Sequence, residues 1–120
     1  MVDGVPMQGD IIKINLDPKQ GHEQYETEFR LGYRPYICLS HKLISNYANI
    51  AVFAPISNTK RQYPLYIPLK DTETTGVVLL DQLVTIDYNA RQFRYIETIP
   101  GGFLKNLLDT VVLVFQNNEG

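Results

Sequence analysis

Residues 9–17 read GDIIKINLD and alternate apolar with polar side chains. Ile12, Ile14 and Leu16 fall on one face of an extended chain, and Lys13, Asn15 and Asp17 fall on the other. A period of two residues predicts a β-strand, here over residues 11–17, with one face in the core and one in solvent. The rest of the sequence is therefore expected to build on a sheet.

Further strand signals follow along the chain, over residues 36–40, 50–56, 65–69, 76–88 and 93–98. The run 50–56 has no polar face, so we expect that strand to be buried on both sides. Pro64 and Pro68 confine the strand 65–69 to a sheet edge, and Asp81-Gln82 bends the strand 76–88. A turn of helix is expected near residues 43–47.

The last stretch has a different period, with apolar residues at the spacing of one helix face: Phe103, Leu104, Leu107, Leu108, Val111, Val112 and Phe115. This spacing predicts a helix over residues 103–115, although the Val-Val-Leu-Val part of it also suits a strand. The fold class is therefore mainly β: a strongly bent, barrel-like antiparallel sheet with a C-terminal α-helix packed on it.

Composition limits the function classes. A chain of 120 residues, 44% of them hydrophobic, suffices for a single domain, expected over residues 1–120. With 11 basic and 13 acidic residues the net charge is −2, so nucleic-acid binding would need a local basic patch. No membrane-length apolar run or signal peptide is visible, which predicts a cytoplasmic protein without a membrane partner. One cysteine, Cys38, gives no metal-ligand spacing, and no cofactor is expected.

The residues able to do chemistry gather at predicted strand ends. Glu23 and Arg34 flank a long polar loop, Ser57 and Asn58 follow a buried strand, and Asp81 and Gln82 interrupt an apolar run. If the sheet curls, these ends would share one rim. Phosphate contacts would come from Arg34, Lys60 and Arg61, and base stacking from Tyr25, Phe29, Tyr33 and Tyr63.

A structural interpretation of the same residues stays open. Arg34 would then pair with Glu23, Ser57 would cap a turn, and the tyrosines would belong to the core. His22 and His41 lie in polar loops, where a histidine is more often solvated than catalytic. Cys38 lies in an apolar strand and is expected to be a core residue.

Five short motifs occur in order between Gly9 and Phe115. They are Gly9-Asp10-Ile11-Ile12 with Leu16-Asp17-Pro18; Gly21-His22-Glu23-Gln24; Arg34-Pro35-Tyr36-Ile37-Cys38-Leu39-Ser40; Pro55-Ile56-Ser57; and Leu79-Leu80-Asp81-Gln82 with Thr85-Ile86-Asp87. In this order the motifs resemble the MazF/PemK family of toxin endoribonucleases (mRNA interferases) of type II toxin–antitoxin systems.

The resemblance implies an SH3-like, plasmid-toxin fold and a homodimer. It also implies metal-independent, sequence-specific cleavage of single-stranded RNA (mRNA), giving 2′,3′-cyclic phosphate and 5′-hydroxyl ends. The partner it implies is a cognate antitoxin of MazE/PemI type, whose acidic tail blocks the RNA groove.

By position, Arg34 matches the family's catalytic arginine and Ser57 its catalytic threonine or serine. Glu23 is a candidate general base, with His22 beside it as the alternative. The RNA-binding residues expected are Gln24, Asn58, Lys60, Arg61, Asp81 and Gln82. The loop between Glu23 and Arg34 is longer than is typical of the family and carries Glu26 and Glu28, which would repel RNA, gate the groove or select substrate.

Two other function classes compete with the nuclease. One is a non-enzymatic toxin of the same fold that poisons DNA gyrase through contacts near the terminal helix, and it would not need Arg34 or Ser57. The other is a protein whose acidic loop has closed the groove, so that it binds an antitoxin but cleaves nothing.

Overall fold

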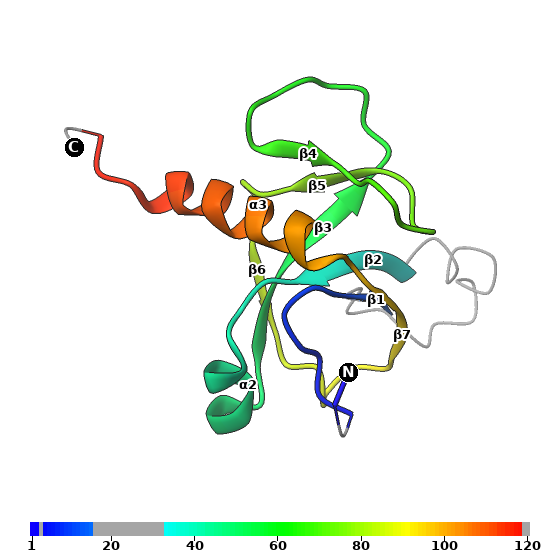
Figure 1. The fold of residues 1–120 in the computed structure, drawn as a ribbon. Helices are drawn as coiled ribbons and strands as arrows, with labels where there is room; N and C mark the ends of the chain where they lie inside the picture. Colours follow the sequence, from blue (N-terminus) through cyan, green and yellow to red (C-terminus); the bar gives the residue numbers. More distant parts are fainter. Residues whose placement is uncertain (3, 16–32, 119–120) are drawn as a thin grey trace.

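The computed structural model describes residues 1–2, 4–15 and 33–118. Within them the chain forms seven strands, two α-helices and a terminal 3-10 turn. The strands are β1 (Asp10–Asn15), β2 (Tyr33–Cys38), β3 (Ala51–Ser57), β4 (Tyr66–Pro68), β5 (Val77–Leu79), β6 (Val84–Ile86) and β7 (Phe93–Thr98). The helices are α2 (Lys42–Ala48) and α3 (Gly101–Val111), and the 3-10 turn η1 (Val112–Phe115) follows α3 (Figure 1).

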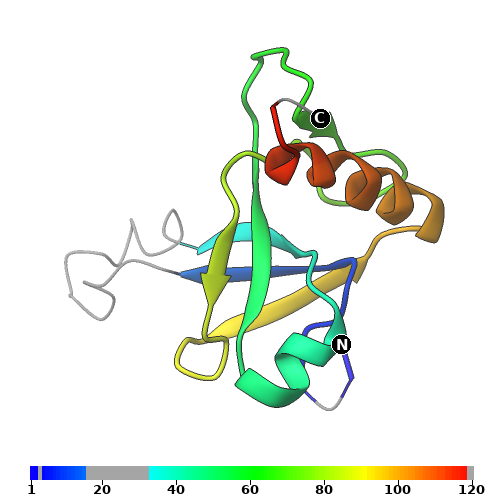
Figure 2. The ribbon, with the colours of Figure 1, turned by 90° about the vertical axis from the view of Figure 1, so that its left-hand side faces the viewer.

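The strands form one bent antiparallel sheet. Their order is β4-β5-β3-β2-β1-β7, and β6 also pairs with β3. Figure 2 shows the strands crossing at wide angles, with α3 near one end of the sheet and α2 near the other. This arrangement confirms the predicted bent sheet with a C-terminal helix, and it places β4 at an edge as Pro64 and Pro68 indicated.

The bend at Asp81-Gln82 is confirmed and explained by the register of β3. Ile56 pairs with Val78 of β5, whereas Phe53 pairs with Val84 of β6. Both halves of the predicted strand 76–88 therefore lie along the same edge of β3, separated by the turn in which the Gln82 N–H donates to the Leu79 carbonyl at 3.2 Å. At this turn the pairing of β5 with β3 ends, and pairing with β3 resumes at β6.

One expectation for the first strand is wrong. β1 was expected to have a wet face, but the side chain of Asn15 is only 2% exposed, and Ile11 is buried on the same side of the strand. The physical reason is that an apolar cluster packs on each side of the curled sheet, with Ile11 in one cluster and Ile12 and Ile14 in the other, so that both faces of β1 are covered. Leu16 and Asp17 of the predicted strand lie outside the described residues.

The second strand begins earlier than predicted. β2 starts at Tyr33, three residues before the expected start, and Pro35 lies within it opposite Lys13 of β1. Pairing of β2 with β3 begins only at Tyr36. Pro35, which has no backbone N–H, therefore lies where β2 makes no hydrogen bonds to β3 that a proline could interrupt.

Two apolar clusters fill the two sides of the curled sheet. One contains Ile11, Ile37, Ala54, Ile56, Val78, Leu80, Ile99 and Leu107, and α3 packs against it through Phe103, Leu104, Leu108 and Val111. The other contains Ile12, Ile14, Tyr36, Cys38, Ala51, Phe53, Ile86 and Tyr88. β3 contributes to both clusters, which confirms that this strand is buried on both sides.

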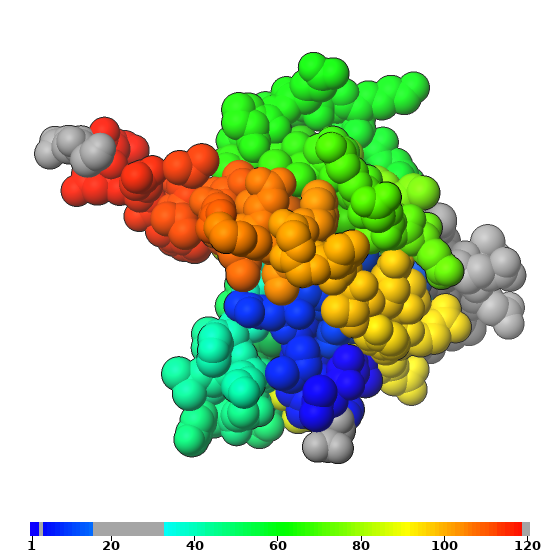
Figure 3. Space-filling view, viewed as in Figure 1, coloured from blue at the N-terminus to red at the C-terminus, as the bar shows by residue number. Residues whose placement is uncertain are grey.

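The terminal helix is confirmed over most of its predicted length. Its apolar face is buried as far as Val111, but Val112 is 57% exposed and Phe115 is 74% exposed. The segment η1 projects from the rest of the molecule, as the red part of the space-filling view shows (Figure 3), and none of its residues belongs to either apolar cluster. The predicted helix is therefore correct as far as Val111, and residues 112–115 form a 3-10 turn instead. Within the described residues, no helix has the length and apolar character needed to cross a bilayer.

Candidate functional site

An open hollow of about 870 Å³ lies where β2, the end of β3 and the β4–β5 hairpin come together. Of the residues predicted to act on RNA, it is lined by Arg34, Ser57, Asn58, Arg61 and Gln82. These come from three separate parts of the sequence, and the curl of the sheet brings them to one rim. Among the described residues that line the hollow there are two arginines and no carboxylate, which favours an anionic ligand.

Arg34 projects into this hollow from β2, where it pairs in register with Ile14. The side chain is exposed, and it makes no hydrogen bond or ion pair with any other described residue. Its charge reaches Tyr36, two residues along the same face of β2: burial raises the pKa of the Tyr36 hydroxyl, and the nearby guanidinium partly offsets that rise. Arg34 is thus a positioned cation available to a ligand.

Ser57 is the last residue of β3 and pairs with Val77 of β5. The residue before Val77, Gly76, has a φ of +129°, and a Cβ there would lie 2.8 Å from the Ser57 carbonyl oxygen. Only glycine permits so close an approach at this φ. The hydroxyl of Ser57 has no hydrogen-bond partner among the described residues, so it too is available.

An aromatic cluster contains Tyr63, Tyr66 and the guanidinium of Arg61. Arg61 and Tyr66 line the same hollow as Arg34 and Ser57. The rings of Tyr63 and Tyr66 meet edge to face at 4.9 Å between centroids, and the Arg61 guanidinium lies 5.2 Å and 5.8 Å from the two centroids. Gln82 Nε2 donates to the Tyr66 hydroxyl at 3.2 Å. Arg61 was predicted as a phosphate contact, and the structure shows that it stacks on aromatic faces at the same time.

The other residues predicted to bind or cleave RNA were not found among those that line this hollow. Lys60 and Asp81 are exposed but do not line the hollow. Glu23 and Gln24 lie outside the described residues, as do His22 and the acidic pair Glu26 and Glu28.

Sequence reasoning missed Tyr66 as a lining residue. The alternation in the strand 65–69 carried the signal, because Leu65, Ile67 and Leu69 pack on the core. Their neighbour Tyr66 must then point to the other side of the strand.

His41 and Cys38 have structural roles. His41 caps the N-terminus of α2, where its Nδ1 accepts the Leu43 N–H at 3.0 Å. Cys38 is fully buried in one of the apolar clusters, and burial raises the pKa of its thiol to about 11. Cys38 is therefore a core residue, as predicted, and His41 is an exposed side chain, as expected, that also caps a helix.

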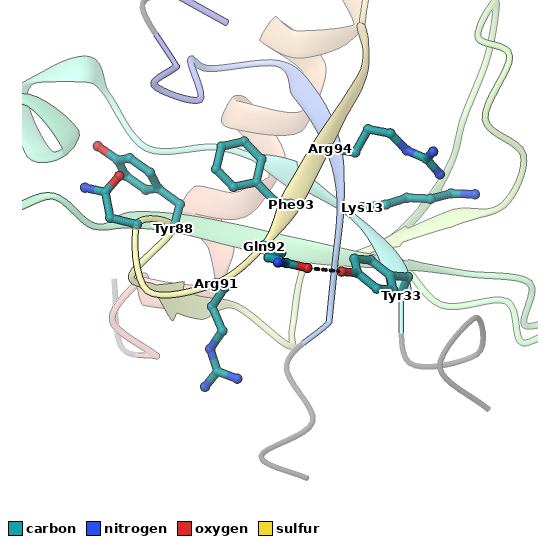
Figure 4. A pocket seen from close by; sticks show the side chains of 8 residues that line it. Lys13, Tyr33, Tyr88, Arg91, Gln92, Phe93 and Arg94 are labelled. Atoms are coloured by element: carbon teal, nitrogen blue, oxygen red, sulfur yellow. Dashed lines mark hydrogen bonds between the residues drawn. The ribbon is translucent and has the colours of Figure 1, made fainter. Parts of the chain in front are cut away.

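A second hollow, of about 910 Å³, lies around the start of β7 (Figure 4). Lys13 and Arg94 extend to one side of it beside Tyr33, and the Tyr33 hydroxyl donates to Gln92 Oε1 at 3.4 Å. Phe93 and Tyr88 point to the opposite side of the strand in the same view. Tyr33, one of the tyrosines proposed for base stacking, therefore lines this hollow and not the one that holds Arg34 and Ser57.

The bent sheet and the first hollow define a class of protein: a small barrel-like domain with a basic, hydroxyl-bearing and aromatic-lined site suited to a single-stranded nucleic acid. A family model for the PemK-like, MazF-like toxin of type II toxin–antitoxin systems matches residues 7–115. The chain belongs to this family, and the resemblance inferred from its motifs is confirmed.

Individual relatives agree with the family assignment. The chain is 33% identical over 87 residues to the endoribonuclease toxin MazF of Escherichia coli K12, covering 72% of this chain and 73% of the relative. It is 30% identical over 106 residues to the endoribonuclease PemK of Escherichia coli, covering 84% and 75%. Its fold matches a chain in the crystal structure of MazE–MazF from Deinococcus radiodurans with a TM-score of 0.72 and 20% identity, covering 92% and 95%.

Proposed function

We propose that this protein is an endoribonuclease toxin that cleaves single-stranded RNA within short sequence motifs. One observation carries the proposal: Arg34 of β2 and Ser57 of β3, the two positions that match the family's catalytic residues, line the same hollow. Family membership and the activity named for the relatives support it.

The proposed reaction is an in-line attack of a ribose 2′-oxygen on the adjacent phosphorus. The new bond joins the 2′-oxygen to phosphorus and the bond to the 5′-oxygen breaks, which gives a 2′,3′-cyclic phosphate and a 5′-hydroxyl. Negative charge grows on the phosphoryl oxygens in the transition state, where the Arg34 guanidinium and the Ser57 hydroxyl donate to them. This route needs no metal ion.

Two protons move in this reaction, one from the 2′-hydroxyl and one to the 5′-oxygen. Arginine does not deprotonate near neutral pH, so Arg34 acts as a charge stabiliser and not as the base. Glu23 is the proposed base and His22 the alternative, and both lie outside the described residues.

The proposal extends to assembly. The apolar side chains of η1 are exposed, with Leu113 at 54% and Phe115 at 74%. An exposed apolar patch of this kind marks a protein interface, and we assign it to a homodimer. A MazE-like antitoxin is the second proposed partner, because a matching fold occurs in a MazE–MazF complex. The protein would act in the cytoplasm as a single domain over residues 1–120.

The test is cleavage of a long single-stranded RNA by purified protein in EDTA, with the ends mapped by sequencing. Wild type should cut at discrete sites and leave cyclic phosphate ends. Arg34→Ala and Ser57→Ala should each lose about 10²–10³-fold in rate while their circular dichroism stays that of wild type. Lys42→Ala, which removes an exposed cation on α2 outside the hollow, is the matched control.

Two results would contradict the proposal. Full cleavage by Arg34→Ala in a preparation free of contaminating nuclease would refute the assignment of Arg34 to the catalytic site. A wild-type protein that cuts no RNA but inhibits DNA gyrase, with toxicity that survives the Arg34→Ala/Ser57→Ala double substitution, would establish the gyrase poison instead.

A further inference from the structure

Tyr66 is held in place at the edge of the hollow without belonging to either apolar cluster. It is the first residue of β4, and its register partner Leu79 lines the same hollow. The next register pair, Ile67 and Val78, faces the core instead. The Tyr66 ring meets the Tyr63 ring edge to face, and the Arg61 guanidinium lies 5.8 Å from its centroid, while the side chain of Tyr66 remains partly exposed.

The polar groups next to that ring form an incomplete hydrogen-bonding pair. The Tyr66 hydroxyl oxygen accepts from Gln82 Nε2 at 3.2 Å, which leaves the hydroxyl proton to donate elsewhere. The amide oxygen of Gln82 has no partner among the described residues, so it can accept. A donor beside an acceptor is the arrangement that the edge of a nucleobase requires.

An aromatic face with an adjacent donor and acceptor matches the way proteins bind unstacked bases. The base lies on the ring, and side chains hydrogen-bond to its polar edge. The two arginines that line the same hollow, Arg34 and Arg61, supply positive charge for the phosphates that flank such a base.

We infer that Tyr66 is a specificity-determining residue, which seats one nucleobase of the RNA next to the phosphate that is cleaved. Its ring provides the stacking surface, and its hydroxyl, together with Gln82, selects the base by its polar edge. This inference rests on the proposed function, because it needs RNA to enter the hollow that holds Arg34 and Ser57.

The experiment uses Tyr66→Phe and Tyr66→Ala, with Tyr47→Phe and Tyr47→Ala as matched controls. Tyr47 lies on α2, outside the hollow, and is 84% exposed. Each protein cleaves a library of random single-stranded RNA, the cut sites are sequenced, and kcat and KM are measured on the best wild-type site.

Tyr66→Phe keeps the ring and loses the hydroxyl, so the base preference at one position of the motif should weaken by about 5–10-fold, the value of one hydrogen bond. Preferences at the other positions should not change. Tyr66→Ala also loses the stacking surface and should raise KM by about tenfold or more, with a smaller effect on kcat. Both Tyr47 variants should cut the wild-type motif at the wild-type rate.

The possible results separate this inference from the proposed function. If wild type cuts RNA and Tyr66→Phe retains both motif and rate, Tyr66 selects no base and the inference fails alone. It also fails if Tyr66→Phe lowers kcat with an unchanged motif, because the hydroxyl then acts on the reaction and not on the base. If wild type cuts no RNA, the proposed function fails and this inference fails with it.

Discussion

Gly76 and Ser57 are in backbone contact: a Cβ built on Gly76 would lie 2.8 Å from the Ser57 carbonyl oxygen and 3.3 Å from Asn58 Oδ1. The contact is part of the β3–β5 ladder, in which Val77 pairs with Ser57. The glycine carbonyl is also engaged, since it accepts the Leu69 N–H at 2.9 Å. Gly76 therefore fixes where the end of β3 lies, and with it the Ser57 hydroxyl.

Gly76→Ala is predicted to destabilise the protein and to misplace Ser57. The positive φ alone costs about 1–3 kcal/mol for a residue with a Cβ, and the clash adds a shift of the backbone. A displacement near 1 Å at a reacting group costs on the order of 10²-fold in rate, so cleavage should fall further than stability explains. Urea unfolding and the cleavage assay check this.

Gly102→Ala is the control for that prediction. Gly102 lies in α3, and a Cβ there would meet nothing within 4 Å. Alanine is a better helix former than glycine by about 0.5–1 kcal/mol, so this variant should be slightly more stable and fully active. If Gly76→Ala matches wild type in both assays, the contact between Gly76 and Ser57 affects neither stability nor cleavage.

Glu97 makes the stability of the β4–β5 hairpin depend on pH. Partial burial raises the pKa of its carboxyl, but the hydroxyl and N–H of Thr74 and the N–H of Glu73 all donate to the carboxylate and bring the pKa below its usual 4.5. A lowered folded-state pKa means that Glu97 stabilises the fold above pH 4.5 and that this contribution is lost as pH falls further.

Glu97→Gln should therefore reduce the free energy of unfolding at pH 7 by about 1–2 kcal/mol, and the loss should shrink as the pH is lowered to 3. Urea denaturation across that range measures it. Glu73→Gln, which keeps the backbone N–H that Glu97 accepts, should retain most of the wild-type stability at pH 7. A constant difference between Glu97→Gln and wild type at every pH would refute the role of the charge.

Cys38 is predicted to resist thiol reagents in the folded protein. Burial raises the pKa of its thiol to about 11, against the opposing effect of hydrogen bonding to Ser40. At pH 8 about one thiol in a thousand is then ionised, and the side chain is 0% exposed. Labelling with a disulfide reagent should be at least about 10²-fold slower in native protein than in urea. Rapid labelling of the native protein would show that the cluster around Cys38 opens readily.

Phe115→Lys is predicted to weaken the proposed homodimer without unfolding the protomer. The side chain is 74% exposed, so a lysine there disturbs no intramolecular packing. Within an apolar interface the charge should raise the dimer dissociation constant by about tenfold or more. Sedimentation equilibrium measures that constant, and Tyr47→Lys on α2 serves as control. A dimer of unchanged affinity would place the interface elsewhere.

The strands and the helix could be predicted because their signals are local. The period-two pattern at Ile12 and Ile14 and the helical spacing from Phe103 to Val111 depend only on neighbouring residues. The wet face assigned to β1 was wrong, because burial on the side of Ile11 and Asn15 comes from a cluster of residues distant in sequence. The same limit explains Phe115, whose position continues the helical pattern after the supporting cluster has ended.

For the candidate site too, the sequence predicted some residues, and the structure was needed for the contacts between them. Residue types and motif order were enough to name five lining residues: Arg34, Ser57, Asn58 and Gln82 at predicted strand ends, and Arg61 in the basic turn between two strands. The sequence did not reveal that Arg61 stacks on Tyr63 and Tyr66, or that Tyr66 bonds Gln82. Those contacts form between a loop, the edge strand and a turn whose mutual placement no local pattern encodes.

The sequence by itself determined which segments are strands or helix and which family the chain resembles, because backbone preferences and side-chain periodicity act over a few residues. The tertiary structure alone decided that Arg34 and Ser57 meet with Tyr66 at one hollow. That meeting depends on the register of β3 with β2 and β5 and on the curl of the sheet. Register and curl are set by how apolar side chains from the whole chain pack together, and this packing is a property of the complete fold.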